Sequence, residues 1–186
     1  MDVDFHRELL DQLQWHWTNQ LRPRLDVLTD AEYFWEPVDA CWSIRPRGDG
    51  TFSCDWAPAE PSPPPVTTIA WRLAHISILV LGLRVATHFE GVSQQEYGER
   101  LQSLDWPGSA VDALARLDEA YDRWVAGVHS WGEHGIAEEC GEAEGPWARR
   151  PRATLVLHIN REVIHHGAEI ATLRDLYRAS NAPTPA

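Results

Sequence analysis

The spacing of apolar residues most constrains what this chain can fold into, because it repeats every three to four positions through four long stretches. This period places apolar side chains on one face of an α-helix. The stretches cover about 5–28, 67–89, 109–131 and 151–178. Four long helices joined mostly by short links predict an all-α protein, and a four-helix bundle is the arrangement that they favour.

Cap residues and a proline refine the ends of these helices. Thr67 or Thr68 is the expected N-cap of the second helix, because its side-chain oxygen can accept a free backbone N–H of the first turn. Pro23 is expected to kink the first helix, since proline has no N–H to donate. The segments TDAE at 29–32 and SQQE at 93–96 match the capping box and predict two short connecting helices.

The segment between the first two long helices, 37–66, is rich in proline, glycine and aspartate. Within it, WSIRP and TFSCDW flank a Gly-Asp-Gly turn, so we expect a small hairpin or an ordered loop. Ordered loops of this length often cover binding sites. A disulfide between Cys41 and Cys54 could bridge the hairpin, but a reducing compartment disfavours it.

Length and charge exclude several classes of protein. A chain of 186 residues predicts one domain over 1–186, with a disordered polar tail at 179–186. The net charge of −12 argues against nucleic acid and anionic membrane as partners, because both attract basic surfaces. The first residues lack a signal-peptide pattern, and the most apolar run, 76–83, is far shorter than the ~20 residues that span a bilayer. We therefore expect a cytoplasmic protein.

The fourth helix contains the segment HINREVIHHGAEI at 158–170, which is unusually rich in histidine and glutamate. At about 100° per residue, His166 falls in the middle of the apolar stripe of this helix. Glu162 lies at the edge of the stripe, one turn before His166. The other polar residues of the segment flank the stripe or leave it: His158, His165 and Glu169.

The second helix contributes His75, the one ionisable residue between Arg72 and Arg84 on an otherwise apolar helix. One hypothesis is that His75, Glu162 and His166 together bind a divalent metal ion, for which imidazole and carboxylate are suitable ligands. The alternative is a helical charge pair between Glu162 and His166, with His75 as a core histidine. A ferritin-like di-iron site is excluded, because its E-x-x-H motif occurs only once.

Two motifs carry a resemblance to a known family: WRLAHI at 71–76 and HINREVIHHGAEI at 158–170. The N-terminal segments LLDQLQWHW, LTDAEYFWEP and CWSIRP add to it. The chain resembles the DinB-like superfamily of metal-binding four-helix bundles, and especially the branch that includes mycothiol-dependent maleylpyruvate isomerase. That branch has a His, Glu, His ligand set, which by position implies His75, Glu162 and His166.

The resemblance also implies a chemistry. The bound metal would be a divalent ion, Zn²⁺ first, with Ni²⁺, Fe²⁺ and Mn²⁺ as alternatives. A low-molecular-weight thiol such as mycothiol or bacillithiol would be the co-substrate of an S-transferase or isomerase, and its partner an electrophile. His165 and Glu169 would lie beside the ligands. Arg45, in the loop before the second helix, could bind an anionic substrate or cofactor; the alternative is a solvated loop arginine. The resemblance further implies a homodimer.

Two alternatives to an enzyme stay open. One is a metal-binding protein of a stress response, without turnover. The other is a dimeric interaction module that uses some of the ten tryptophans on an aromatic face.

Overall fold

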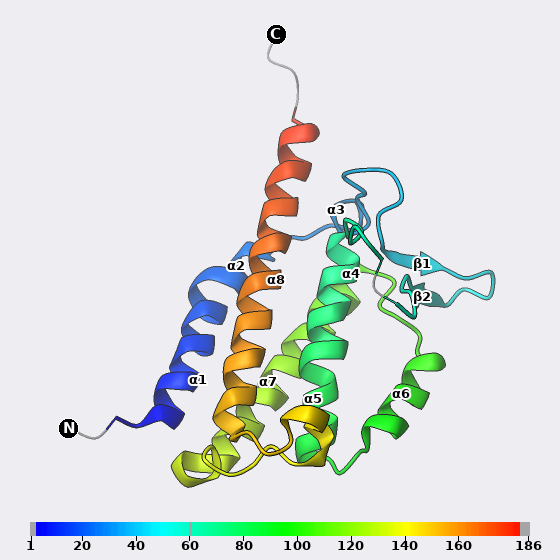
Figure 1. The fold of residues 1–186 in the computed structure, drawn as a ribbon. Coiled ribbons are helices and arrows are strands. Elements are labelled where there is room, and N and C mark those ends of the chain that lie inside the picture. Colours follow the sequence, from blue (N-terminus) through cyan, green and yellow to red (C-terminus); the bar gives the residue numbers. More distant parts are fainter. Residues whose placement is uncertain (1–2, 60, 183–186) are drawn as a thin grey trace.

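The computed structural model describes residues 3–59 and 61–182, and most of them are helical, in keeping with the all-α expectation. Four long helical segments, here called rods 1 to 4, lie side by side (Figure 1). Their elements are, for rod 1, α1 (Phe5–His16), η1 (Trp17–Leu21) and α2 (Arg22–Arg24); for rod 2, α4 (Ile69–Ala74), η2 (His75–Gly82) and α5 (Leu83–Phe89); for rod 3, α7 (Ala110–Gly135); and for rod 4, α8 (Arg152–Ser180).

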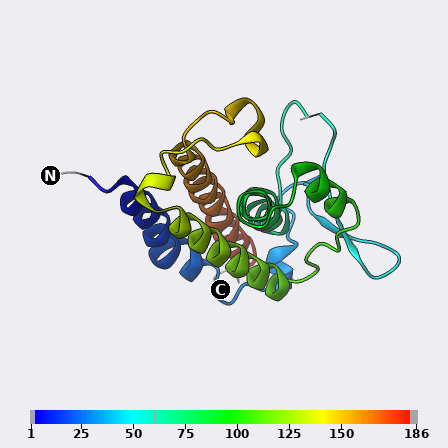
Figure 2. The same ribbon diagram turned by 90° about the horizontal axis from the view of Figure 1, so that it is seen from below.

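Shorter elements connect the rods. They are α3 (Asp30–Tyr33), β1 (Ile44–Pro46), β2 (Phe52–Cys54), α6 (Gln94–Gln102) and the 3₁₀-helix η3 (Glu142–Trp147). The predicted caps begin several of the helices: the side chains of Thr29, Thr68 and Ser93 each accept the backbone N–H three residues later. The hairpin and α6 lie on the side of rod 2 that is remote from rod 1 (Figures 1 and 2).

Rods 1 and 2 each contain a π-helical segment, which the sequence analysis did not predict. In rod 1 the Arg22 N–H donates to the Trp17 carbonyl, five residues earlier, just before Pro23. Because Pro23 can neither donate an N–H nor pack its ring against the preceding carbonyls, a widened turn here is the local form of the expected kink. In rod 2 the π-helical segment η2 begins at His75 and ends at Gly82.

Rod 1 ends at Arg24, before the predicted end at 28. The buried guanidinium of Arg174, from α8, explains this difference. It donates to the carbonyls of Arg24 and Asp26 and forms two hydrogen bonds with the Glu32 carboxylate of α3. The terminal carbonyl of rod 1 and that of Asp26 just after it thus accept from another rod, and the helix does not need to continue.

Packing between the rods builds the core. Rod 1 contacts α7 and α8, and so does rod 2. The predicted stripe of α8 is confirmed by the burial of Leu155, Ile159, Val163, Ile170 and Leu173. Fully burying one such side chain stabilises a fold by roughly 1.5–3 kcal/mol. The stripe therefore fixes which side of α8 faces rods 1 and 2.

Rod 2 is long and apolar enough, by length and composition, to cross a membrane, and it is the one such helix in residues 3–59 and 61–182. However, 61% of its most apolar window is buried inside the protein. It has the features of a core helix, so the finding does not indicate a membrane protein.

The predicted hairpin is present, with β1 and β2 antiparallel and Ile44 opposite Cys54. Gly50 has a φ of +86° in the turn, a backbone conformation that favours glycine. The Cys41 and Cys54 thiols are free.

The start of the expected disordered tail was wrong, because residues 179 and 180 belong to α8. Asn181 ends that helix by donating both its backbone and its side-chain N–H to the Tyr177 carbonyl. The rest of the expected tail from 183 onward lies outside the described residues.

Candidate metal centre

Rods 2 and 4 bring three predicted side chains together. His75 lies at the start of η2, and Glu162 and His166 lie one turn apart on α8. Each offers one ligand atom such that all three atoms lie within 4.8 Å of one another. The two imidazole rings meet edge to face, with their centroids 4.6 Å apart. Residues distant in sequence thus form one compact group of nitrogen and oxygen donors.

His166 is held from both sides by carboxylates of its own helix. Its Nδ1 lies 2.6 Å from Oε2 of Glu169, and its Nε2 lies 3.3 Å from Oε2 of Glu162. The short contact with Glu169 orients the ring, and Nε2 points toward Glu162. Metal-binding histidines are commonly oriented in this way, with the second ring nitrogen donating to a carboxylate.

Arg72 completes this arrangement, and the sequence analysis did not identify it as a site residue. Its Nε lies 3.0 Å from the same Oε2 of Glu169, and its guanidinium packs over the Trp71 ring. Burial lowers the pKa of Arg72, and the Glu169 carboxylate opposes that shift. Arg72 precedes His75 by three positions on the same helix face, which is the signal that could have indicated it.

His75 has an environment that keeps its imidazole neutral. The ring stacks on Trp71, with centroids 5.1 Å apart and an interplanar angle of 9°. Burial, together with the nearby His166 and Arg72, lowers the pKa of His75 to about 4. Its buried Nδ1 has no hydrogen-bond partner among the described residues. A buried ring nitrogen without a partner is unfavourable, and a ligand interaction would relieve this.

Glu162 is ionised and held toward the histidines. Burial raises the pKa of its carboxyl, but His158, a hydrogen bond from Arg161 and His166 outweigh burial and lower the pKa overall. Oε1 faces His158 and Arg161, which leaves Oε2 near His166. Two imidazoles and one carboxylate match the donor set of catalytic zinc sites, so these residues fit a divalent ion.

A second group of side chains, His165, His166 and Glu169, also lies within 4.8 Å. In this group the His165 side chain is 64% exposed, and its Nε2 is 3.5 Å from Oε1 of Glu169. Glu169 already accepts from Arg72 and His166, so its carboxylate is less available than that of Glu162. The group therefore fits the neighbouring role that the sequence analysis gave to His165 and Glu169.

Arg45 contacts the hairpin and the loop before it. Its guanidinium pairs with Asp55 and Glu36 and donates to the Cys41 carbonyl at 2.6 Å. The Asp55 carbonyl in turn accepts the indole N–H of Trp71 at 2.8 Å. Arg45 thus reaches His75 only through Asp55 and Trp71, and its binding of an anionic substrate stays a prediction.

The family model of the DinB superfamily matches residues 12–170. The chain belongs to the DinB superfamily. The part that matches the DinB superfamily includes all three candidate ligands, together with Arg72 and Glu169. Neither a curated protein nor a solved structure matches the chain.

Proposed function

We propose that this chain binds a divalent metal ion through His75, Glu162 and His166 and uses it to activate a low-molecular-weight thiol for S-transfer or isomerisation. The observation that carries the proposal is the convergence of the three donor atoms within 4.8 Å, from two different rods. Membership of the DinB superfamily supports it. We also propose that the four rods form a DinB-like four-helix bundle.

When bound, a divalent ion with three protein ligands has a position for a thiol and lowers the pKa of that thiol, so that the thiolate is available at neutral pH. The residues of the chain prepare this chemistry. Glu169 orients the ring of His166, and Arg72 holds Glu169 in place. Trp71 stacks on His75 and fixes the orientation of its ring.

Zinc is the proposed ion, with nickel, iron and manganese as alternatives, and metal analysis tests this. Protein purified without chelators and without a histidine tag should contain close to one equivalent of metal. The variants His75→Ala and Glu162→Ala should lose it, because each removes one of the three ligands. His165→Ala is the matched control, since it removes an exposed imidazole next to the site. Equal metal content in all four proteins would contradict the proposal.

Thiol activation has its own test. Protein loaded with Co²⁺ should change its visible absorption when a thiol is added, because sulfur coordination alters the spectrum of this ion. The rate of thiol addition to a model electrophile should then fall in His166→Ala. An unchanged rate in that variant would remove the enzymatic part of the proposal.

The second candidate is a metal-binding protein without turnover, as in a stress response. Its supporting observation is the low exposure of the candidate ligands: 11% for the His166 side chain and 22% for that of Glu162. A Co²⁺ spectrum that does not respond to thiol would favour this candidate.

We further propose a cytoplasmic homodimer. The exposed side chains of Phe5 and Leu157 border a largely apolar groove between α1 and α8, which supports self-association. Sedimentation of the protein as a monomer at micromolar concentrations would contradict the dimer.

A further inference from the structure

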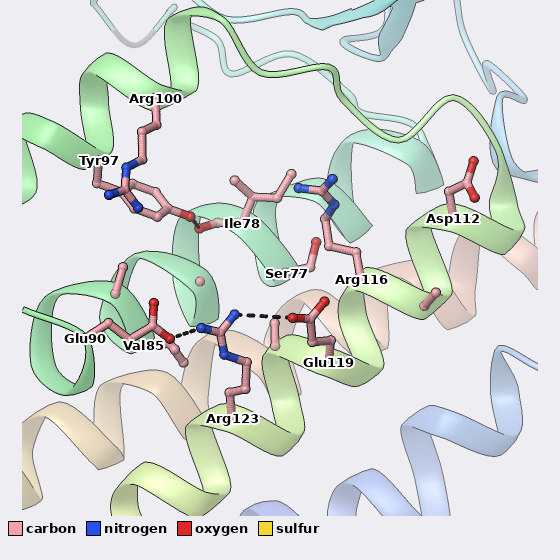
Figure 3. A pocket seen from close by; sticks show the side chains of 14 residues that line it. Ser77, Ile78, Val85, Glu90, Tyr97, Arg100, Asp112, Arg116, Glu119 and Arg123 are labelled. Carbon is pink, nitrogen blue, oxygen red and sulfur yellow. Dashed lines mark hydrogen bonds and ion pairs between the residues drawn. The ribbon is translucent and has the colours of Figure 1, made fainter. Parts of the chain in front are cut away.

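A cavity of about 580 Å³ lies between rod 2, α6 and α7. Figure 3 shows its walls: Tyr97 and Arg100 come from α6, Ser77 and Ile78 from η2, and Arg116 from α7. None of the candidate metal ligands lines this cavity. The cavity is therefore separate from the candidate metal centre.

Arg116 is an exception among the arginines of the chain. It is half-buried and has no hydrogen-bond, ion-pair or cation–π partner within residues 3–59 and 61–182. Every other buried or half-buried arginine of that part of the chain pairs with a carboxylate: Arg22, Arg45, Arg72, Arg84, Arg152 and Arg174. A partly desolvated guanidinium without an acceptor is unfavourable, so its position indicates a ligand that supplies one.

The acidic residues of the cavity form no direct pair with Arg116 among the described residues. Glu90 and Glu119 both pair with Arg123, at the other end of the cavity (Figure 3). Asp112 accepts the hydroxyl of Ser109. None of these carboxylates forms a hydrogen bond or ion pair with Arg116, so its guanidinium N–H groups remain available to a ligand.

Arg100 can add to that charge. It pairs with Glu96, but the two side chains are 56% and 52% exposed. Such exposed pairs contribute little to stability, so Arg100 can turn toward a ligand at low cost. Figure 3 places Arg100 and Arg116 on facing walls of the cavity.

The floor of the cavity is preorganised. The Tyr97 hydroxyl donates to the Ile78 carbonyl at 2.7 Å, and a Cβ at position 82 would lie only 2.8 Å from that hydroxyl. Glycine at 82 therefore permits this contact. Val85 and Ala86 extend the floor with apolar surface. A ligand with a short apolar body and one charged end matches these walls.

We propose that this cavity binds a small molecule that carries a carboxylate or phosphate group, with Arg116 donating to the anion and Arg100 assisting. Guanidinium groups bind carboxylates and phosphates alike through paired N–H donors. The geometry therefore favours an oxyanion but does not distinguish a carboxylate from a phosphate.

Calorimetric titration of the full chain at low ionic strength tests the proposal with three probes: benzoate, inorganic phosphate and the neutral analogue benzamide. At least one anion should bind, and benzamide should not. Arg116→Gln should weaken anion binding about tenfold or more, because it removes a charged donor. Arg150→Gln is the matched control, since Arg150 is exposed and lies outside the cavity.

Arg116→Gln should fold normally, because it removes a charge that has no partner. Ala115→Asp, on the exposed part of the cavity wall, provides a second variant that should weaken anion binding through repulsion. His75→Ala should bind the anions as the unaltered protein does, so failure of the metal proposal would not affect this one.

Three results would overturn the proposal: neither anion binds at millimolar concentrations, Arg116→Gln binds them equally well, or benzamide binds as tightly as benzoate. Binding of only one of the two anions would support the proposal and identify the group.

Discussion

Replacing Glu169 by glutamine tests how the proposed metal ligands are held in position. The Glu169 carboxylate lies 2.6 Å from Nδ1 of His166 and 3.0 Å from Nε of Arg72, through the same oxygen. Glutamine keeps the shape of the side chain but loses the charge that both partners require. Changes in such partners of metal ligands typically reduce metal affinity about 10- to 100-fold. This corresponds to about 1.4–2.7 kcal/mol.

The structure indicates the upper part of that range. Arg72 is only 18% exposed, so without the carboxylate its positive charge would remain close to the metal centre with little solvent to screen it. Repulsion between Arg72 and the bound cation would then add to the loss of the His166 hydrogen bond.

Competition with a chromophoric chelator measures the affinity of the purified protein for Zn²⁺. Glu169→Gln should weaken it as stated, with all three ligands still present. The control is His165→Ala, which removes the other imidazole near Glu169; that side chain is 64% exposed and should not alter the affinity. If Glu169→Gln binds Zn²⁺ as tightly as the unaltered protein, the assigned role of Glu169 is wrong.

Two further predictions concern stability. Gly127→Ala should destabilise the protein by about 1–3 kcal/mol, because a Cβ there would lie 2.3 Å from the Phe89 ring. In the control Gly98→Ala the added Cβ meets nothing within 4 Å, so this change should stabilise its helix by about 0.5–1 kcal/mol. Unfolding in urea measures both free-energy changes, and two changes of the same sign would contradict the prediction. The second concerns Glu144. Burial raises the pKa of its carboxyl, but hydrogen bonds from His88 and Arg84 outweigh burial and lower it. The stability that Glu144 contributes is therefore present above its ordinary pKa of 4.5 and is lost as the pH falls through the lower folded value. The difference in unfolding free energy between the protein and Glu144→Gln should shrink over that acid range, and a difference independent of pH would refute the assignment.

The sequence predicted α8 well because that helix is regular. Its α-helical geometry runs without interruption from Arg152 to Ser180, so the assumption of about 100° per residue holds along its length. The spacing therefore predicts His166 on the buried face, and that residue is only 8% exposed. Glu162, expected at the edge of the stripe, is half-buried.

Rod 2 was harder to interpret, for two physical reasons. It is apolar around most of its circumference, so no stripe indicates which face contacts which neighbour. The π-helical segment from His75 to Gly82 also changes the number of residues per turn, so an α-helical wheel misplaces the residues after it. The side of rod 2 that faces the cavity could not be derived from spacing.

Pairs between distant residues were beyond the sequence alone. Arg72 pairs with Glu169 across two rods, and Arg84 pairs with Glu144 of η3. Charged residues occur throughout the chain, and no local pattern states which carboxylate a given arginine will meet. Only the packing of the helices decides these partners, and for that reason Arg72 was missed.

The stacking of His75 on Trp71 connects the hairpin to the candidate metal centre. The Trp71 indole is anchored to the carbonyl of Asp55, directly after β2, so a movement of the hairpin would be transmitted to the imidazole. The tip is free for manipulation, since a side chain added at Gly48 would meet nothing within 4 Å. A fluorophore attached at position 48 would thus report, in real time, on motions that reach the centre from outside.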